Sequence, residues 1–253
     1  CRVTGMPHDA PVLQVRDLAV SFPGRAGVLH QVDLDVARGE KIGVVGPNGA
    51  GKTTLFLSIT GVVDPDRGSV DVAGRRVEPG RFRPDVGLVF QNPDHQLFCP
   101  SVAEDVAFGP RNLGLDEGEV ARRVAKAMET VGATGLADRV PHHLSGGERR
   151  MVSIATVMAL EPELVIYDEP SANLDIRSRR RLVTYLQDAE HTQLIASHDL
   201  ELILEVCHRT VLLDAGRVVA DGPTRELMND PELMERHGLE RPHSLIPHAE
   251  PHH

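Results

Sequence analysis

Short apolar runs recur along the chain, and polar or glycine-rich stretches separate them. Runs of four or five apolar residues between turn residues are typical of strands that are buried on both faces. Five segments are expected to be short strands: Lys41–Val45, Ser69–Val72, Val86–Phe90, Glu163–Tyr167 and Gln193–Ala196. Lys41–Val45 and Val86–Phe90 are expected to be buried. The pattern therefore predicts a sheet whose strands are spread over most of the chain.

Alternating apolar and polar positions predict antiparallel strands at both ends of this region. Near the N-terminus, the runs 12–15 and 18–22 are separated by Arg16 and Asp17, which predicts a hairpin-like start, and 28–36 alternates again. Late in the chain, 210–213 and 217–220 predict a second hairpin around Asp214-Ala215-Gly216.

Helical patterns lie between the predicted strands. Ser101 opens one helix, with Glu104 as a capping-box partner, and we expect it to stop near Phe108 because Gly109-Pro110 follows. The other expected helices are 54–59, 117–131, 146–160, 176–188 and 199–206, with a polar, helical segment after Pro223. No internal repeat is visible. The order predicts an α/β fold with a helical insert and an antiparallel β region.

Composition fits an ordinary globular protein, with 41% hydrophobic and 25% charged residues. No apolar run approaches the ~18 residues that span a bilayer, and no secretory signal is visible. Cys1, Cys99 and Cys207 form no disulfide pattern, which suits a reducing cytosol. Met6 is an alternative start, so whether Cys1–Gly5 is native stays open. The formal net charge of -10 argues against nucleic-acid binding.

The stretch Gly46–Thr54 fits G-x-x-x-x-G-K-[ST], the phosphate-binding loop. A predicted strand precedes it and a predicted helix follows it, so its backbone N–H groups would converge on an anion at a helix N-terminus. We expect Lys52 to reach the β- and γ-phosphates and Thr53 to hold Mg²⁺. The expected nucleotide-binding residues of the loop are Asn48, Gly49, Ala50, Gly51, Lys52, Thr53 and Thr54.

Two acids follow the apolar residues 164–167. Because the carboxyl ends of parallel strands meet at one edge of a sheet, these acids are expected beside the phosphate loop. Asp168 would bind Mg²⁺, directly or through water, and Glu169 would act as general base on the attacking water.

A second candidate anion site is the motif Leu144–Glu148. Gly146 and Gly147 would leave bare N–H groups at the start of a helix that Ser145 and Glu148 cap. One nucleotide does not need two such sites from one domain. The motif therefore indicates a shared site, in which Ser145, Gly146, Gly147 and Glu148 close on the γ-phosphate held by a partner subunit.

This set of motifs strongly resembles the ATP-binding cassette (ABC) ATPases over residues 12–221. The resemblance identifies 46–54 as the Walker A loop, 144–148 as the signature, 164–169 as Walker B and 171–175 as the D-loop. It implies that Phe22 stacks on adenine, that Gln91 senses Mg²⁺ and water, and that His198 contacts the γ-phosphate and the attacking water. Catalytic roles would fall to Glu169, His198, Gln91 and Lys52, and Mg²⁺ ligands would be Thr53, Gln91 and Asp168.

Asn173 stands where glycine is frequent in the D-loop of this family. Asparagine tolerates the left-handed αL conformation better than most residues, so we expect the loop geometry to survive. Tyr167 adds a hydroxyl to the Walker B strand, and this hydroxyl should need a partner.

Residues 90–98 and 102–115 are closely similar to the energy-coupling-factor ATPases, most of all to the cobalt/nickel import subunits. Residues 141–148 and 238–242 point the same way. This resemblance implies a groove after Gln91 where a coupling helix of a membrane partner docks near 91–98. The groove candidates are Asp94, Gln96 and Leu97, with Arg111 as a further contributor.

The resemblance implies ATP and Mg²⁺ as cofactors, a second ATPase subunit, identical or paralogous, and a location on the cytoplasmic face of the membrane. A substrate-binding membrane subunit would be an indirect partner. Alternatives are an importer ATPase for a vitamin or amino acid, a non-transport ABC protein and a P-loop kinase. We expect a tail at 1–11, the ATPase domain at 12–221 with a helical subdomain at about 92–160, and an extension at 222–242. The histidine-rich end at 243–253 is expected to be a disordered tail, with Ni²⁺ or Co²⁺ binding as the alternative.

Overall fold

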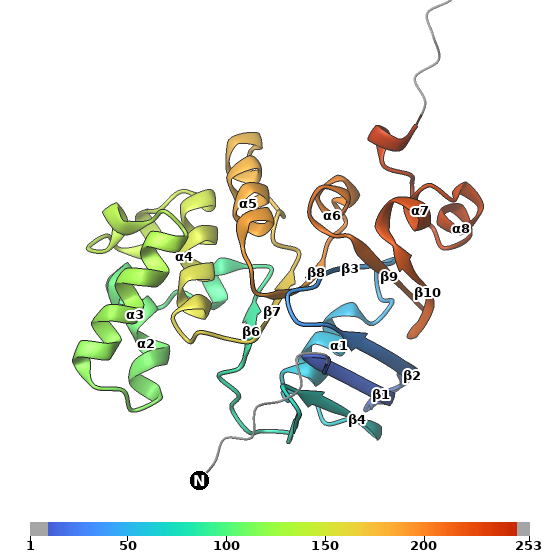
Figure 1. Cartoon of the computed structure of the whole chain (residues 1–253), viewed down its shortest axis with the longest axis horizontal. Coiled ribbons are helices and arrows are strands. Elements are labelled where there is room, and N and C mark those ends of the chain that lie inside the picture. The colour runs from blue at the N-terminus through green and yellow to red at the C-terminus, as the bar shows by residue number, and fades with distance from the viewer. Residues whose placement is uncertain (1–9, 247–253) are drawn as a thin grey trace, which may run out of the picture.

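The computed structural model describes residues 10–246, apart from the side chains of residues 25 and 26. A six-stranded sheet forms its centre, in the order β10-β9-β3-β8-β7-β6 (Figure 1). Its strands are β3 (Lys41–Val45), β6 (Val86–Val89), β7 (Leu164–Asp168), β8 (Thr192–Ala196), β9 (Arg209–Asp214) and β10 (Arg217–Pro223). All neighbours pair in parallel except β10, which is antiparallel to β9. Four of the five predicted short strands lie in this sheet, and the late hairpin is confirmed.

A second, antiparallel sheet has the order β2-β1-β4-β5. Its strands are β1 (Leu13–Phe22), β2 (Arg25–Val36), β4 (Arg67–Val72) and β5 (Arg75–Arg76). The predicted hairpin at Arg16 and Asp17 is wrong, because β1 is one strand that pairs with β2 and β4. Asp17 has a φ of 47° at a shift of register, so the polar pair marks a β-bulge instead of a turn.

Eight α-helices complete the described part of the chain. They are α1 (Lys52–Ile59), α2 (Val102–Asn112), α3 (Glu117–Thr130), α4 (Gly146–Met158), α5 (Ile176–Asp188), α6 (Leu200–Val206), α7 (Thr224–Met228) and α8 (Pro231–Arg236). Figure 1 shows α2, α3 and α4 grouped at one end of the molecule, beyond β6. None of the helices described is long and apolar enough to cross a membrane.

The central sheet is buried on both faces because alternate residues of its strands enter two different apolar clusters. In β7, Val165 and Tyr167 belong to the cluster that includes residues of α4, α5 and α6. Leu164 and Ile166 belong to the cluster formed with α1 and the antiparallel sheet. This two-sided burial explains why the strands are continuous apolar runs.

Helix α2 extends past the predicted stop, so the prediction that it ends at Gly109-Pro110 is wrong. Pro110 lies inside the helix and is buried, and Leu113 N still donates to Gly109 O at 3.1 Å. A Cβ on Gly109 would lie 2.8 Å from Leu160 Cδ2, so this glycine allows α2 to pack closely against the end of α4. The packing outweighs the hydrogen bond that proline removes from a helix.

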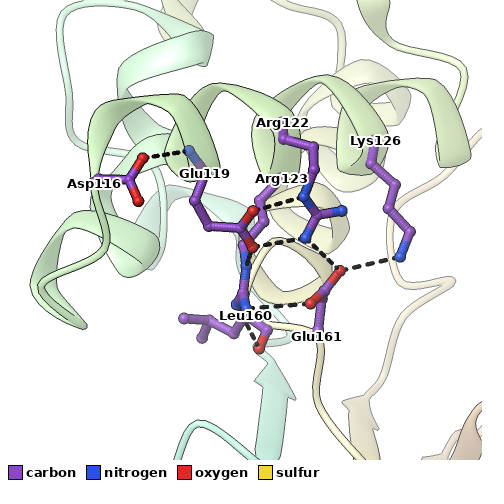
Figure 2. Close-up of polar contacts among 7 residues, drawn as sticks. All are labelled: Asp116, Glu119, Arg122, Arg123, Lys126, Leu160 and Glu161. Carbon is purple, nitrogen blue, oxygen red and sulfur yellow. Dashed lines mark hydrogen bonds and ion pairs between the residues drawn. The ribbon is translucent and has the colours of Figure 1, made fainter.

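Charged side chains tie α3 to the turn between α4 and β7 (Figure 2). Glu119 pairs with Arg122 and Arg123, and Glu161 pairs with Arg122, Arg123 and Lys126 at 3.0 to 3.4 Å. Glu161 has a φ of 53°. The cluster therefore fixes a turn of unfavourable backbone geometry against the helical region.

The C-terminal segment packs beside α6 and β9. The first residues of the predicted tail are ordered, because His243–Leu245 form a 3-10 turn. Glu201 explains this order: it accepts hydrogen bonds from Ser244 N at 3.0 Å and Ser244 Oγ at 2.7 Å. The rest of the histidine-rich end, and residues 1–9 of the tail predicted at 1–11, lie outside the described residues.

Candidate functional site

The loop between β3 and α1 depends on glycines at three positions. Gly46, Gly49 and Gly51 have φ values of 150°, 79° and 108°. A Cβ on Gly46 would lie 1.9 Å from Leu213 O, and one on Gly51 would lie 2.7 Å from Leu29 Cδ2. The loop therefore packs its backbone against β9 and β2 in a conformation that side chains would prevent.

Lys52 begins α1 and is largely buried beneath this loop. Its Nζ donates to Gly46 O at 2.6 Å and to Pro47 O at 3.1 Å. Burial lowers the pKa of Lys52, while the carboxylates of Glu169 and Asp168 oppose that shift. The ammonium group is thus held between the loop backbone and the two acids at the end of β7.

A cavity of about 500 Å³ opens over the loop. Its lining residues are Val28, Asn48, Gly49, Ala50, Gly51, Lys52, Thr53, Thr54, Gln91, Asp168, Glu169 and His198. Every predicted catalytic and magnesium residue lies in this lining, although four separate segments of the chain supply them. Val28 of β2 was not predicted, and the sequence signal that could have indicated it is weak, since it is one alternating strand residue among many.

Thr53 and Asp168 meet across the cavity. Thr53 Oγ1 donates to Asp168 Oδ2 at 3.1 Å. Burial raises the pKa of Asp168, although the Thr53 hydrogen bond and the charge of Lys52 oppose the shift. A hydroxyl and a carboxylate at the phosphate end of the loop form an oxygen donor set that fits Mg²⁺.

Glu169 follows the last residue of β7, and its backbone has a left-handed φ of 48°. Its Oε2 accepts a hydrogen bond from His198 N at 3.0 Å, and its Oε1 lies 3.5 Å from His198 Nε2. Burial raises the pKa of Glu169, and the His198 amide opposes that shift. Glu169 Oε1 has no hydrogen-bond partner within the described residues, so one carboxylate oxygen remains free to accept.

His198 follows β8 and precedes the first turn of α6. Asp199 caps that helix by accepting from Leu202 N at 3.0 Å. Arg179 of α5 holds the same carboxylate with two donors, Nε at 2.6 Å and Nη2 at 3.1 Å. The backbone on the C-terminal side of His198 is therefore fixed to both α5 and α6.

Ser145–Glu148 form a separate structure at the start of α4. Ser145 Oγ accepts from Glu148 N at 3.3 Å, and Glu148 Oε2 accepts from Ser145 N at 2.8 Å, a complete capping box. These bonds lower the pKa of Glu148. A Cβ on Gly146 would meet no described atom within 4 Å, whereas one on Gly147 would lie 2.1 Å from Ser178 Oγ. Gly146 thus faces open space.

The loop cavity does not include Phe22 or Ser145–Glu148 in its lining. Phe22 ends β1 and is half-exposed, and its contact with adenine stays a prediction. The separation of the signature from the loop is what a site shared between two subunits requires, and its closure on a partner's nucleotide also stays a prediction.

The D-loop prediction for Asn173 is confirmed. Asn173 has a φ of 60°, in the left-handed region that asparagine tolerates. It lines a second cavity of about 360 Å³ with Gln91 and Gly146. The Tyr167 hydroxyl also has the partner that we expected, since it lies 2.9 Å from His191 Nε2.

The predicted groove residues differ in their exposure. Leu97 is only 2% exposed and belongs to the apolar core, so its prediction as a groove residue is wrong. Gln96 bonds inward to Ser153 O and Thr156 Oγ1, both at 2.8 Å. Asp94 is exposed, with Oδ1 3.4 Å from Arg149 Nε, and Arg111 pairs with Glu117 of α3.

Two exposed aromatic side chains in this region were missed by the sequence analysis. Phe98 and Phe108 are 62% and 47% exposed, and their ring centroids lie 4.9 Å apart in an edge-to-face pair. In a chain with only 3% aromatic residues, two phenylalanines ten residues apart were the available signal. Phe98 lies in the segment between β6 and α2 (residues 90–101), which we call the Gln91 loop, and Phe108 lies in α2. Together they make an exposed apolar surface.

Comparisons with known proteins show the family of this chain. The ABC transporter family profile matches residues 29–172. An ABC transporter ATP-binding protein of Synechocystis sp. is 49% identical over 235 residues, which cover 93% of this chain and 83% of that protein. The energy-coupling factor transporter ATP-binding protein EcfA of Methanothermobacter thermautotrophicus is 44% identical, covering 91% and 77%.

The fold also matches solved structures. The structure of cbiO1 from Clostridium perfringens, described as part of the ABC transporter complex cbiONQ, has a TM-score of 0.80 and 32% sequence identity. The match covers 90% of this chain and 94% of that one. The chain therefore belongs to the ABC transporter family, as an ATP-binding subunit with the ABC ATPase fold that hydrolyses ATP.

Proposed function

We propose that this subunit powers an energy-coupling-factor importer that carries cobalt or nickel ions. The similarity to EcfA and to cbiO1 supports the transporter type. The observation that carries the catalytic part is one cavity that contains the phosphate loop together with Asp168, Glu169 and His198. An intact set of acids and histidine is what an ATP-hydrolysing motor requires.

In this proposal, the loop backbone and Lys52 bind the phosphates of ATP, and Phe22 contacts the adenine. Thr53, Gln91 and Asp168 would hold Mg²⁺, which supplies charge neutralisation at the phosphate oxygens. Glu169 takes a proton from the attacking water through its unpaired oxygen, and His198 fixes the geometry of that water and the γ-phosphate.

The nucleotide site is completed by a second subunit. Gly146 is open on the side away from its own chain, which suits the approach of a partner's γ-phosphate. Two chains would bind two ATP molecules between the loop of one and Ser145–Glu148 of the other. Hydrolysis would separate them and move the membrane partner. The second subunit is a copy of this chain or a paralogue.

The membrane partner docks beside the Gln91 loop in this proposal. Phe98 and Phe108 supply an exposed apolar surface there, and Asp94 is an exposed acid of the same loop. A coupling helix with apolar side chains would cover this surface. The subunit would then lie at the cytoplasmic face of the membrane as a peripheral protein and reach the substrate-binding subunit only indirectly.

The test is to purify the tagged chain with its membrane partners and identify them by mass spectrometry. We expect a transmembrane coupling subunit and a substrate-binding membrane subunit, and ATP-dependent uptake of Co²⁺ or Ni²⁺ by vesicles that contain the complex. Uptake of a vitamin or an amino acid would instead support another importer. Recovery without any membrane protein would contradict the transport proposal.

A further inference from the structure

We propose that Arg150 is a positioning residue that fixes the Gln91 loop to α4, the helix that begins with the signature motif. The proposal rests on the two-subunit ATPase proposed above. It adds a connection within one chain between a residue of its own nucleotide site and the motif that serves the partner's site.

The side chain of Arg150 joins α4 to the backbone of Phe90 and Gln91. Its Nη1 donates to Phe90 O at 2.6 Å, and its Nη2 donates to Gln91 O. Arg150 is only 1% exposed, and it is the largest fully buried side chain among the described residues. Both guanidinium contacts therefore go to the backbone that carries Gln91, where β6 ends.

Retaining a cation here costs stability. Burial is the sole cause that lowers the pKa of Arg150, to about 10. No carboxylate pairs with it among the described residues, and its Nε atom has no hydrogen-bond partner there. A buried charge held only by carbonyl groups is poorly compensated. A neutral side chain could fill this space at lower cost, so we infer that the two hydrogen bonds serve the position of the loop.

Gln96 also connects this segment to α4. Its Oε1 accepts from Phe90 N at 3.3 Å, while its Nε2 donates to Ser153 O and Thr156 Oγ1 of α4. Phe90 is thus held to α4 through both its amide and its carbonyl. Among the described residues, Arg150 is the one whose side chain donates to the carbonyl of Gln91, which makes it the closer determinant of where Gln91 lies.

Arg150 lines a cavity that contains residues of both the Gln91 loop and the signature motif. Gln91, Gly146, Arg150 and Asn173 line one space of about 360 Å³. Gly146 belongs to the motif that would close on the partner's nucleotide, and Gln91 lines the chain's own loop cavity. A movement of α4 would therefore move Gln91 with it, so closure of one site would adjust the other.

The test is a double-mutant cycle on ATP hydrolysis by the full chain, with Arg150→Gln, Gln91→Ala and the double variant. If Arg150 acts through Gln91, each single variant should lower kcat about tenfold with a KM for ATP within about twofold of wild type, because the phosphate loop is intact. The double variant should be no more than about twofold slower than either single one. Effects that multiply to about a hundredfold would overturn the proposal, as would an unchanged kcat in Arg150→Gln.

Arg83→Gln is the matched control. Arg83 is also a buried arginine that donates to backbone carbonyls, at Val72 and Arg76. It differs from Arg150 in that it also pairs with Asp85, and it lies outside the loop cavity. Arg83→Gln should lower the melting temperature while kcat of the folded protein stays within about twofold of wild type.

If Arg150→Gln does not fold, Arg150→Lys replaces it in the cycle, since one ammonium can donate to one of the two carbonyls. If Arg150→Lys retains part of kcat and its effect still does not multiply with that of Gln91→Ala, the positioning role is supported. If the two effects multiply, the role is refuted. Recovery of the tagged chain without any membrane protein would contradict the proposed importer, whereas this cycle, which measures only ATP hydrolysis, would remain interpretable.

Discussion

The carboxylate of Glu169 accepts a hydrogen bond from the backbone amide of His198 at 3.0 Å. Its other oxygen lies 3.5 Å from the Nε2 atom of the same histidine. The first contact does not depend on the imidazole, so Glu169 keeps its orientation when the side chain of residue 198 changes. This separates the effects of substituting the two residues.

His198→Ala should lower kcat by roughly 10²- to 10³-fold, the typical cost of removing one group that stabilises the transition state. The backbone amide still holds Glu169, and Arg179 still holds Asp199, so the fold should be preserved. Steady-state hydrolysis and thermal denaturation check the two statements. Unchanged hydrolysis would refute the catalytic role of His198.

Glu169→Gln should abolish turnover and leave ATP binding intact. Glutamine has the same shape, and its amide oxygen can still accept from His198 N, but it cannot take a proton from water. With ATP and Mg²⁺, the variant should therefore elute from size-exclusion chromatography as an ATP-bound dimer. A monomer with wild-type turnover would show that Glu169 is not the base. Wild type without nucleotide is the control for the dimer.

Much of this fold was predictable because the sequence patterns report local physics. The two-sided burial of β3 and β7 appears directly as apolar runs, and the phosphate loop appears as spaced glycines. Three features depended on tertiary contacts that no local pattern contains. Asp17 lies in a β-bulge of a strand that also pairs with β4. Helix α2 continues past Pro110 where it packs against Leu160, and Leu97 lies in the apolar core.

The residues of the site that belong to local sequence motifs could also be predicted, whereas those that depend on tertiary contacts could not. Motif residues lie at strand ends or helix starts, so their clustering follows from the parallel sheet. Arg150 and Phe108 could not be found in this way, because their importance arises from contacts with residues about 60 and 10 positions away.

Gly46→Ala should prevent the loop from forming its present conformation. The new Cβ would lie 1.9 Å from the backbone oxygen of Leu213, and the φ of 150° is unfavourable for alanine. We expect loss of nucleotide binding and a fall in stability of at least about 2 kcal/mol. Gly222→Ala is the control, because a Cβ there meets no described atom within 4 Å. Nucleotide titration with equal affinity for both variants would contradict the prediction.

Asn173 offers a test of backbone strain in the D-loop. At a φ of 60°, Asn173→Gly should leave stability within about 0.5 kcal/mol, whereas Asn173→Val should cost about 1–2 kcal/mol, because a β-branched residue disfavours the left-handed region. Urea denaturation measures both. Equal midpoints for the two variants would show that the loop relaxes to another conformation.

His191 should make stability depend on pH below neutrality. Its pKa is lowered to about 4, first by burial and then by the charge of Lys41. Its Nε2 lies 2.9 Å from the Tyr167 hydroxyl, and the Tyr185 ring centroid is 6.5 Å from its own. Other charged side chains that line the adjoining cavity are Lys126, Glu129, Arg181, Asp188 and Glu190.

The sign of the effect follows from linkage. An unfolded histidine has a pKa near 6.5, so between about pH 6.5 and 4 the unfolded state binds the extra proton and the folded state does not. The contribution of His191 is complete above pH 6.5 and falls by up to about 3 kcal/mol as the pH decreases to 4. His191→Gln cannot titrate in this range and is the matched control. Urea denaturation of both proteins at pH 7, 6, 5 and 4 should show the stability of wild type falling more steeply. Parallel curves would mean that His191 is protonated in the folded protein as readily as in the unfolded chain.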